Sequence, residues 1–318
     1  MSVAEPATHW SRIGEAGAVA GMKFLLLVYR LTGRAGFRLF LYPVMLYFYL
    51  FRGTARRASQ AYLARLRPLL PAAQQGGLSS YRHFVMFGEV LLDKLLVWMG
   101  RIRREDVEFA TPDTVAEIET GRRGGIIIVS HLGNFEICNA IAQQIPNIRL
   151  TILVYTQHAR KFNALLQGVA RGADVEILQV NDLSPATVML FNQRVQEGGY
   201  IVIAGDRTPV SGERYVSEVA FLGDIAAFPQ GPFILAGLLR CPVYLLFCLK
   251  RRDRYHVYIE KFSELIDYRQ RRHRPQVLEE ATRAFAERLQ HYCLQAPLQW
   301  FNFFPFWRDE RALEDSRD

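Results

Sequence analysis

A short run at residues 125–130 (GIIIVS) limits the folds open to this chain more than any other feature. Its isoleucines and valine are consecutive, so an extended strand built from them is apolar on both faces. Such a strand belongs in the middle of a sheet that has helices covering both sides. The run therefore predicts a central strand in a layered α/β fold.

Further β-rich runs and helical stretches alternate along the chain from about residue 105. Strands are expected at residues 150–155, 175–180, 200–204, 243–248 and 256–259. Helices are expected at residues 134–145, 159–171, 184–197, 230–240 and 276–294. This alternation predicts an α/β fold with a central sheet, mixed or mostly parallel, that is flanked by helices.

Residues 1–104 are expected to form an N-terminal, membrane-associated helical region ahead of an α/β domain at residues 105–318. Residues 16–51 are strongly apolar, but the longest charge-free run, residues 39–51, would span only about 20 Å as a helix. Because the hydrocarbon core of a bilayer is about 30 Å thick, a spanning and an interfacial helix both stay open. Arg and Lys at the edges of the apolar segments favour an anionic membrane face over a buried core. Two more helices are expected, at residues 55–70 and 79–99.

The composition narrows the choice of partners. The net charge of +8 favours anionic partners such as lipid headgroups, an acidic carrier protein or nucleic acid. No nucleic-acid-binding motif accompanies the charge, so no nucleic-acid partner is predicted. The basic segments 250–254 and 269–274 are expected to face solvent or the membrane, or to dock the carrier protein. The four cysteines are scattered without a CxxC pair, which argues against a zinc site and a disulfide framework.

His131 directly follows the predicted central strand, at the edge of an α/β sheet where ligands bind. Glu136 lies in the first turn of the next helix, so its carboxylate can reach one imidazole nitrogen, fix the tautomer and raise the basicity of the other nitrogen. His131 is thus a candidate general base for a hydroxyl, with a purely structural histidine as the alternative. Backbone amides at the Gly133 turn are expected to stabilise an oxyanion, and Asn134 to cap the helix.

Other polar residues are candidates for substrate binding. Asp206 and Arg207 follow another predicted strand and so share a sheet edge with His131, although they can equally form a structural ion pair. Arg160 and Asn163 are further candidates, and no metal site is predicted. Residues 221–229 are expected to form a turn before a helix, either in the core or as a wall of an acyl tunnel.

The motifs of several other enzyme classes are absent. The chain has no G-x-S-x-G, P-loop or G-x-G-x-x-G motif, which disfavours a serine hydrolase, an NTPase and a dinucleotide enzyme.

The segment SHLGNFE, residues 130–136, resembles the His-x4-Asp/Glu signature of glycerolipid-type acyltransferases. More closely, it resembles that of the bacterial late acyltransferases of lipid A biosynthesis, the lauroyl/myristoyl transferases. The similarity continues through residues 152–166, 203–213, 219–247 and 297–307. The chain departs from the family at Thr156, where an Arg is common, and at residues 205–207, which replace an Asp-Gln-Asp turn. It is similar to a divergent branch, whose acceptor need not be lipid A.

The resemblance implies an O-acyltransferase at the cytoplasmic face of a bacterial inner membrane. Its donor would be an acyl thioester of acyl carrier protein or coenzyme A, and its acceptor a hydroxyl of a lipid or glycolipid, with no cofactor. A glycerophosphate or lysophospholipid acyltransferase shares this chemistry and stays open. So do a non-catalytic lipid-binding protein of the same fold, and a thioesterase that uses water as the acceptor.

Overall fold

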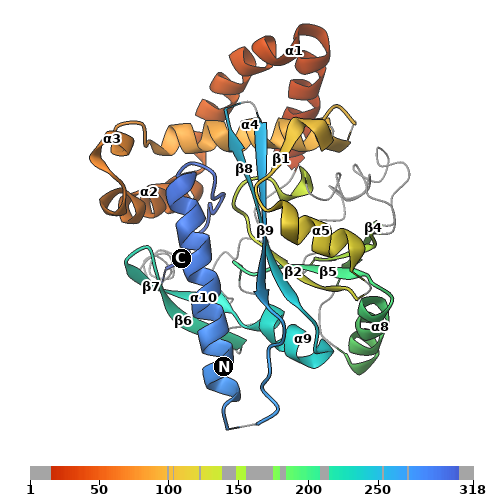
Figure 1. The fold of residues 1–318 in the computed structure, drawn as a ribbon. Helices are drawn as coiled ribbons and strands as arrows, with labels where there is room; N and C mark the ends of the chain where they lie inside the picture. The colour runs from red at the N-terminus through yellow and green to blue at the C-terminus, as the bar shows by residue number, and fades with distance from the viewer. Residues whose placement is uncertain are drawn as a thin grey trace, which may run out of the picture.

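The computed structural model describes residues 16–98, 100–102, 104–121, 123–137, 148–154, 175–179, 184–207, 215–252, 254–270 and 272–307. Within these residues, a central sheet has helices on both faces, and a group of N-terminal helices lies at one end of it (Figure 1). This arrangement confirms the predicted α/β fold with an N-terminal hydrophobic helical region.

The main sheet has seven strands in the order β1-β9-β8-β2-β5-β3-β4. Their bounds are β1 Val107–Phe109, β2 Gly125–Val129, β3 Leu150–Val154, β4 Val175–Gln179, β5 Tyr200–Ala204, β8 Val243–Arg251 and β9 Arg254–Ser263. The five strands from β8 to β4 run parallel, whereas β9 is antiparallel to β8 and pairs in parallel with β1. β2 lies between β8 and β5, so the run that is apolar on both faces is a central strand, as predicted.

β2 sends alternate side chains into two separate hydrophobic cores. Ile126 and Ile128 belong to the core under α8, α9 and α10, and Ile127 and Val129 belong to the core under α5. These helices are α5 Pro112–Thr120, α8 Pro185–Gln196, α9 Gly231–Leu239 and α10 Arg274–Gln295. Helices thus keep water from both faces of β2, as expected for a strand whose side chains are apolar on both faces.

A two-stranded antiparallel hairpin, β6 (Val216–Phe221) and β7 (Asp224–Pro229), stands where the sequence suggested only a turn. The turn itself is short, with Leu222 and Gly223 at φ values of 53° and 90°. Buried and exposed residues alternate along β6, and this period of two is the strand signal that the prediction overlooked. Phe221 and Phe228 are fully buried, in agreement with a core role.

The N-terminal helices are α1 Ala16–Phe51, α2 Gly53–Leu66, α3 Ala72–Gln75 and α4 Ser80–Trp98, with 3-10 turns at Arg67–Leu69 and Arg104–Asp106. α1 bends at Gly33, which has a φ of 70°. Beyond the bend, Phe37 and Leu41 of α1 pack against α4. A Cβ at Gly88 would lie 2.5 Å from Leu41 Cδ1, so glycine lets the two helices approach closely.

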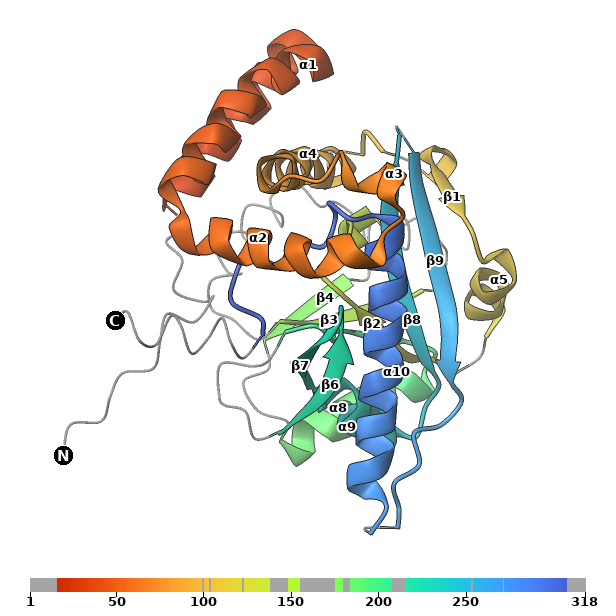
Figure 2. The same cartoon turned by 90° about the vertical axis from the view of Figure 1, so that its left-hand side faces the viewer.

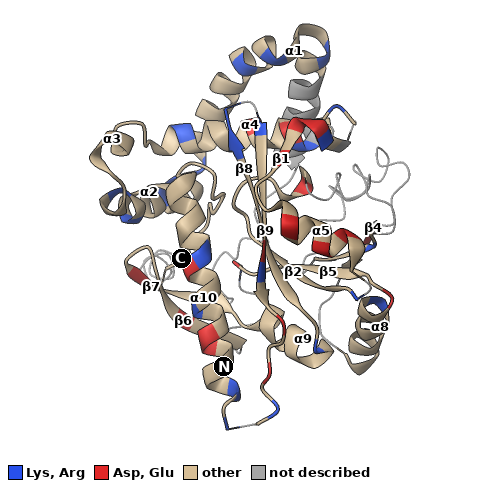
Figure 3. Cartoon of the chain, viewed as in Figure 1, with Lys and Arg blue, Asp and Glu red and all other residues tan. Residues whose placement is uncertain are grey.

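Figure 2 shows that α1 projects away from the sheet. The side of α1 that does not face α4 exposes apolar side chains. The exposed set is Leu27, Leu31, Leu39, Phe40, Tyr42, Leu46, Tyr47, Leu50 and Phe51. Helix α1 contains Lys and Arg but no Asp or Glu, so the charged positions drawn on it in Figure 3 are blue. Among the described helices, none combines the length and the apolar character needed to cross a membrane.

Candidate active site

His131 lies at the carboxyl end of β2, two residues after Val129. The chain then turns at Gly133, whose φ of 72° lies in the left-handed region. A Cβ at Gly133 would come within 1.9 Å of the Cys248 carbonyl oxygen on β8, so a larger residue cannot fit there. This close approach fixes the loop that carries His131 against the neighbouring strand.

The other neighbour of β2, strand β5, brings Asp206 to His131. β2 and β5 are parallel and pair Val129 with Ala204, so the residues just beyond both strands meet at one sheet edge. Asp206 Oδ1 lies 2.7 Å from His131 Nδ1, and Asp206 Oδ2 accepts the His131 backbone N–H at 2.7 Å. The Trp300 indole N–H also donates to Oδ2, at 2.9 Å. Three donors therefore hold the buried carboxylate.

The surroundings favour a neutral imidazole beside a charged carboxylate. Burial lowers the pKa of His131, and the charges of Arg207 and Lys94 lower it further, against the opposing effect of Asp206. Burial alone would raise the pKa of Asp206, but His131 and Arg207 hold it below its usual value. With Nδ1 donating its proton to Asp206, the lone pair of the ring is on Nε2, which suits a general base.

Glu136 contacts Lys94 on α4, with 2.5 Å between Lys94 Nζ and Glu136 Oε1. The structure thus corrects the expected contact, because the carboxylate on the imidazole belongs to Asp206 and not to Glu136. The physical reason is the parallel pairing of β2 with β5. It aligns Val129 with Ala204, so Asp206, two residues beyond β5, lies beside His131, two residues beyond β2.

The backbone amides expected to bind an oxyanion already have acceptors within the protein. The Gly133 N–H donates to the Gln299 carbonyl at 2.8 Å, and the Asn134 N–H donates to the Cys248 carbonyl at 2.9 Å. These bonds hold the His131 loop in place, so the expectation that the two amides stabilise an oxyanion is corrected. Asn134 itself is buried.

Arg207 lies next to the His131–Asp206 pair. Its Nη2 donates to the Phe301 carbonyl at 3.4 Å, and its guanidinium carbon lies 5.2 Å from the centre of the Phe304 ring. Burial lowers the pKa of Arg207 to about 10, against the charge of Asp206, so the side chain stays charged at neutral pH. The other two candidates, Arg160 and Asn163, lie outside the described residues.

The C-terminal segment connects the site to α4. The Phe301 N–H donates to the His131 carbonyl at 2.9 Å, and Leu132 forms an antiparallel bridge with Trp300. His83 of α4 lies with Nε2 2.9 Å from the Trp300 carbonyl, and burial lowers the pKa of His83 to about 3. A neutral His83 donates this bond from Nε2–H, which links α4 to the residue that holds Asp206.

A family model described as bacterial lipid A biosynthesis acyltransferase matches residues 84–309. The chain belongs to this family. The match begins within α4 and includes His131, Glu136, Asp206 and Trp300. No protein in the comparison with curated proteins matches the chain.

Membership of the lipid A acyltransferase family implies acyl transfer to a lipid acceptor. Two residues around the candidate site were missed by sequence reasoning, namely Lys94 beside Glu136 and Trp300 as the donor to Asp206. The charged pair Asp93-Lys94 inside an otherwise apolar helical stretch was a usable signal for the first. Across the described residues, no group of three or more His, Cys, Asp or Glu side chains is arranged to hold a metal ion.

Proposed function

We propose that the protein transfers a fatty acyl group from a thioester to a hydroxyl of a lipid or glycolipid, with His131 as general base and Asp206 as its orienting carboxylate. The observation that carries the proposal is the 2.7 Å contact between His131 Nδ1 and Asp206 Oδ1 at the end of β2. This contact fixes the tautomer that leaves Nε2 basic.

In the proposed reaction, His131 Nε2 takes the proton of the acceptor hydroxyl as the oxygen attacks the thioester carbonyl. A carbon–oxygen bond forms, and the carbonyl electrons move onto oxygen to give a tetrahedral oxyanion. The oxyanion then collapses and the carbon–sulfur bond breaks. The imidazolium returns its proton to the departing thiolate, so the products are an ester and a free thiol, and no acyl-enzyme forms.

Acyl carrier protein is the donor that fits the net positive charge of the chain best, because such carriers are acidic. The acceptor is a membrane lipid or glycolipid, and the site works at the cytoplasmic face of the inner membrane. The apolar exposed side of α1, with Arg30 and Arg38 within the helix and Arg52 directly after it, supports an interfacial attachment in which this side of the helix enters the lipid.

The test is to incubate the purified protein with radiolabelled acyl carrier protein and a lipid extract from its host. The wild type is expected to form a labelled lipid, whereas His131→Ala is not. A folded wild type that gives no labelled lipid would contradict acyl transfer. Release of free fatty acid without an acceptor would point instead to a thioesterase that uses water.

A further inference from the structure

His131 and Lys94 both keep part of their side chains in contact with solvent. The side chains of His131 and Lys94 are 28% and 19% exposed, whereas that of Asp206 is only 1% exposed. Lys94 is also close enough for its charge to lower the pKa of His131. A substrate that reaches the imidazole from solvent is therefore within range of the Lys94 charge.

The proposed reaction develops negative charge on the thioester oxygen, and that charge needs a donor fixed in advance. The amides of Gly133 and Asn134 are bonded to carbonyls of the protein. Arg207 is packed between the Asp206 carboxylate and the aromatic segment at Phe301 and Phe304. Among the described residues, Arg207 and Lys94 are cations whose charges lower the pKa of His131, and Lys94 is the one that pairs with the helix turn after the His131 loop.

Lys94 is held in place from two directions. Its Nζ lies 2.5 Å from Glu136 Oε1 and 5.7 Å from the centre of the Phe135 ring. Both contacts are with the helix turn that directly follows the His131 loop. Since an ammonium group has three N–H donors, the ion pair with Glu136 is compatible with a further hydrogen bond to substrate.

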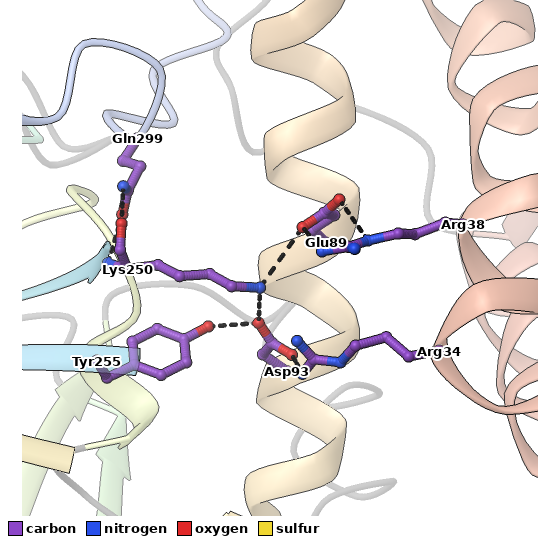
Figure 4. A network of polar contacts seen from close by, with 7 residues as sticks. All are labelled: Arg34, Arg38, Glu89, Asp93, Lys250, Tyr255 and Gln299. Carbon is purple, nitrogen blue, oxygen red and sulfur yellow. Dashed lines mark hydrogen bonds and ion pairs between the residues drawn. The ribbon is translucent and has the colours of Figure 1, made fainter. Parts of the chain in front are cut away.

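The helix that carries Lys94 is itself fixed by a buried polar network (Figure 4). Asp93, its neighbour on α4, lies 2.5 Å from Lys250 Nζ on β8 and accepts the Tyr255 hydroxyl of β9 at 2.6 Å. Arg34 of α1 contacts the other Asp93 oxygen at 2.5 Å. The Gln299 side-chain amide accepts the Lys250 backbone N–H at 2.8 Å and donates to the Lys250 carbonyl at 2.7 Å. The backbone carbonyl of Gln299 also accepts the Gly133 N–H, so the network fixes α4 relative to the His131 loop.

We propose that Lys94 is a catalytic residue whose ammonium donates a hydrogen bond to the thioester oxyanion, and that Glu136 is the positioning residue that aims it. This inference rests on the proposed acyl transfer and gives Glu136 a task other than orienting His131. No proton is transferred by Lys94, because the acceptor proton passes through His131 alone.

The test compares Lys94→Met and Lys94→Arg with the wild type, using acyl-phosphopantetheine and acyl-pantetheine thioesters as donors. Loss of an oxyanion donor lowers kcat by roughly 10²–10³-fold. Lys94→Met is expected to show this loss equally with both donors, and Lys94→Arg to recover part of it. The Met variant should also move the acidic limb of the pH–rate profile to higher pH, because removing a nearby positive charge raises the pKa of His131.

Other outcomes contradict the inference. If Lys94→Met raises KM only for the donor that carries a phosphate, the lysine anchors that phosphate and does not act on the oxyanion. If kcat and the pH profile stay at wild-type values, Lys94 has no catalytic role. Lys261→Met, at an exposed ion pair with Glu117 and Glu264, is the matched control and should keep full activity. A wild type without transfer, or an active His131→Ala variant, would overturn the proposed function itself.

Discussion

At the residue scale, His131 is held by Asp206, a carboxylate that follows a different strand of the sheet. Glu136 is five positions after His131, and the resemblance to a His-x4-Glu signature pointed to it as the orienting acid. Asp206 is 75 positions away along the chain, yet it bonds both the imidazole and the backbone of His131. The sequence placed both residues at the correct sheet edge, but the pairing of β2 with β5 decides which carboxylate reaches the ring.

Trp300→Phe tests whether the indole helps to set the basicity of the dyad. Loss of its N–H leaves the Asp206 carboxylate with one donor fewer, so Asp206 binds the His131 Nδ1–H more strongly and the pKa of His131 rises. Because the neutral form is the base, the acidic limb of the pH–rate profile should move up by roughly half a unit to one unit.

Trp307→Phe is the matched control for this prediction. Trp307 is also fully buried, but its indole donates to the Phe221 carbonyl and not to the dyad. Its pH–rate profile should therefore overlay that of the wild type. Identical profiles for both variants would mean that the Trp300 bond to Asp206 is without effect on the base.

At the scale of elements, the expected strands agree with the described strands because each one is a short run rich in β-branched and other apolar residues. The short β1, helix α5 and the β6–β7 hairpin escaped notice, since their signals are brief or were read as a turn. The sequence also gave no sign that Lys250, in a basic segment expected to face solvent or membrane, is 8% exposed and paired with Asp93. Such a pairing depends on the approach of α4 to β8, which no local pattern encodes.

Lys250→Met is expected to destabilise the fold, because Asp93 would stay buried with part of its compensating charge removed. Breaking a buried ion pair costs about 3–5 kcal/mol, so the free energy of unfolding in urea should fall by about 3 kcal/mol. Lys261→Met breaks only exposed pairs and should leave the free energy of unfolding close to that of the wild type. Equal losses in the two variants would show that the network in Figure 4 does not hold α4 to the sheet.

At the scale of the whole molecule, the family match spans residues 84–309 and leaves α1, α2 and α3 ahead of it. The division at residues 104 and 105 stays a prediction. Helix α4, which precedes this division, contacts Trp300 and Glu136 of the candidate site through His83 and Lys94. The apolar character of α1 was evident from the sequence. Which of its side chains remain exposed depends on the packing of Phe37 and Leu41 against α4.

Leu50→Glu tests the proposed attachment of α1 to a membrane. Leu50 is 54% exposed on the apolar side of α1, and burying such a side chain in lipid is worth about 1.5–3 kcal/mol. The substitution should weaken sedimentation with phosphatidylglycerol-containing vesicles by at least about tenfold. Met189→Glu, at an apolar residue on α8 that is 74% exposed, should bind like the wild type. Equal binding by both variants would contradict attachment through α1.

The most direct test of the central claim compares acyl-transfer rates of Asp206→Asn and Glu136→Gln under identical conditions. If Asp206 orients the base, Asp206→Asn should lower kcat by roughly 10³–10⁴-fold, as loss of an orienting carboxylate does in other dyads and triads. Glu136→Gln, which keeps a hydrogen-bond acceptor for Lys94, should lower kcat by about tenfold, or about 1.4 kcal/mol. A near-normal Asp206→Asn beside an inactive Glu136→Gln would contradict the account and return the orienting role to Glu136.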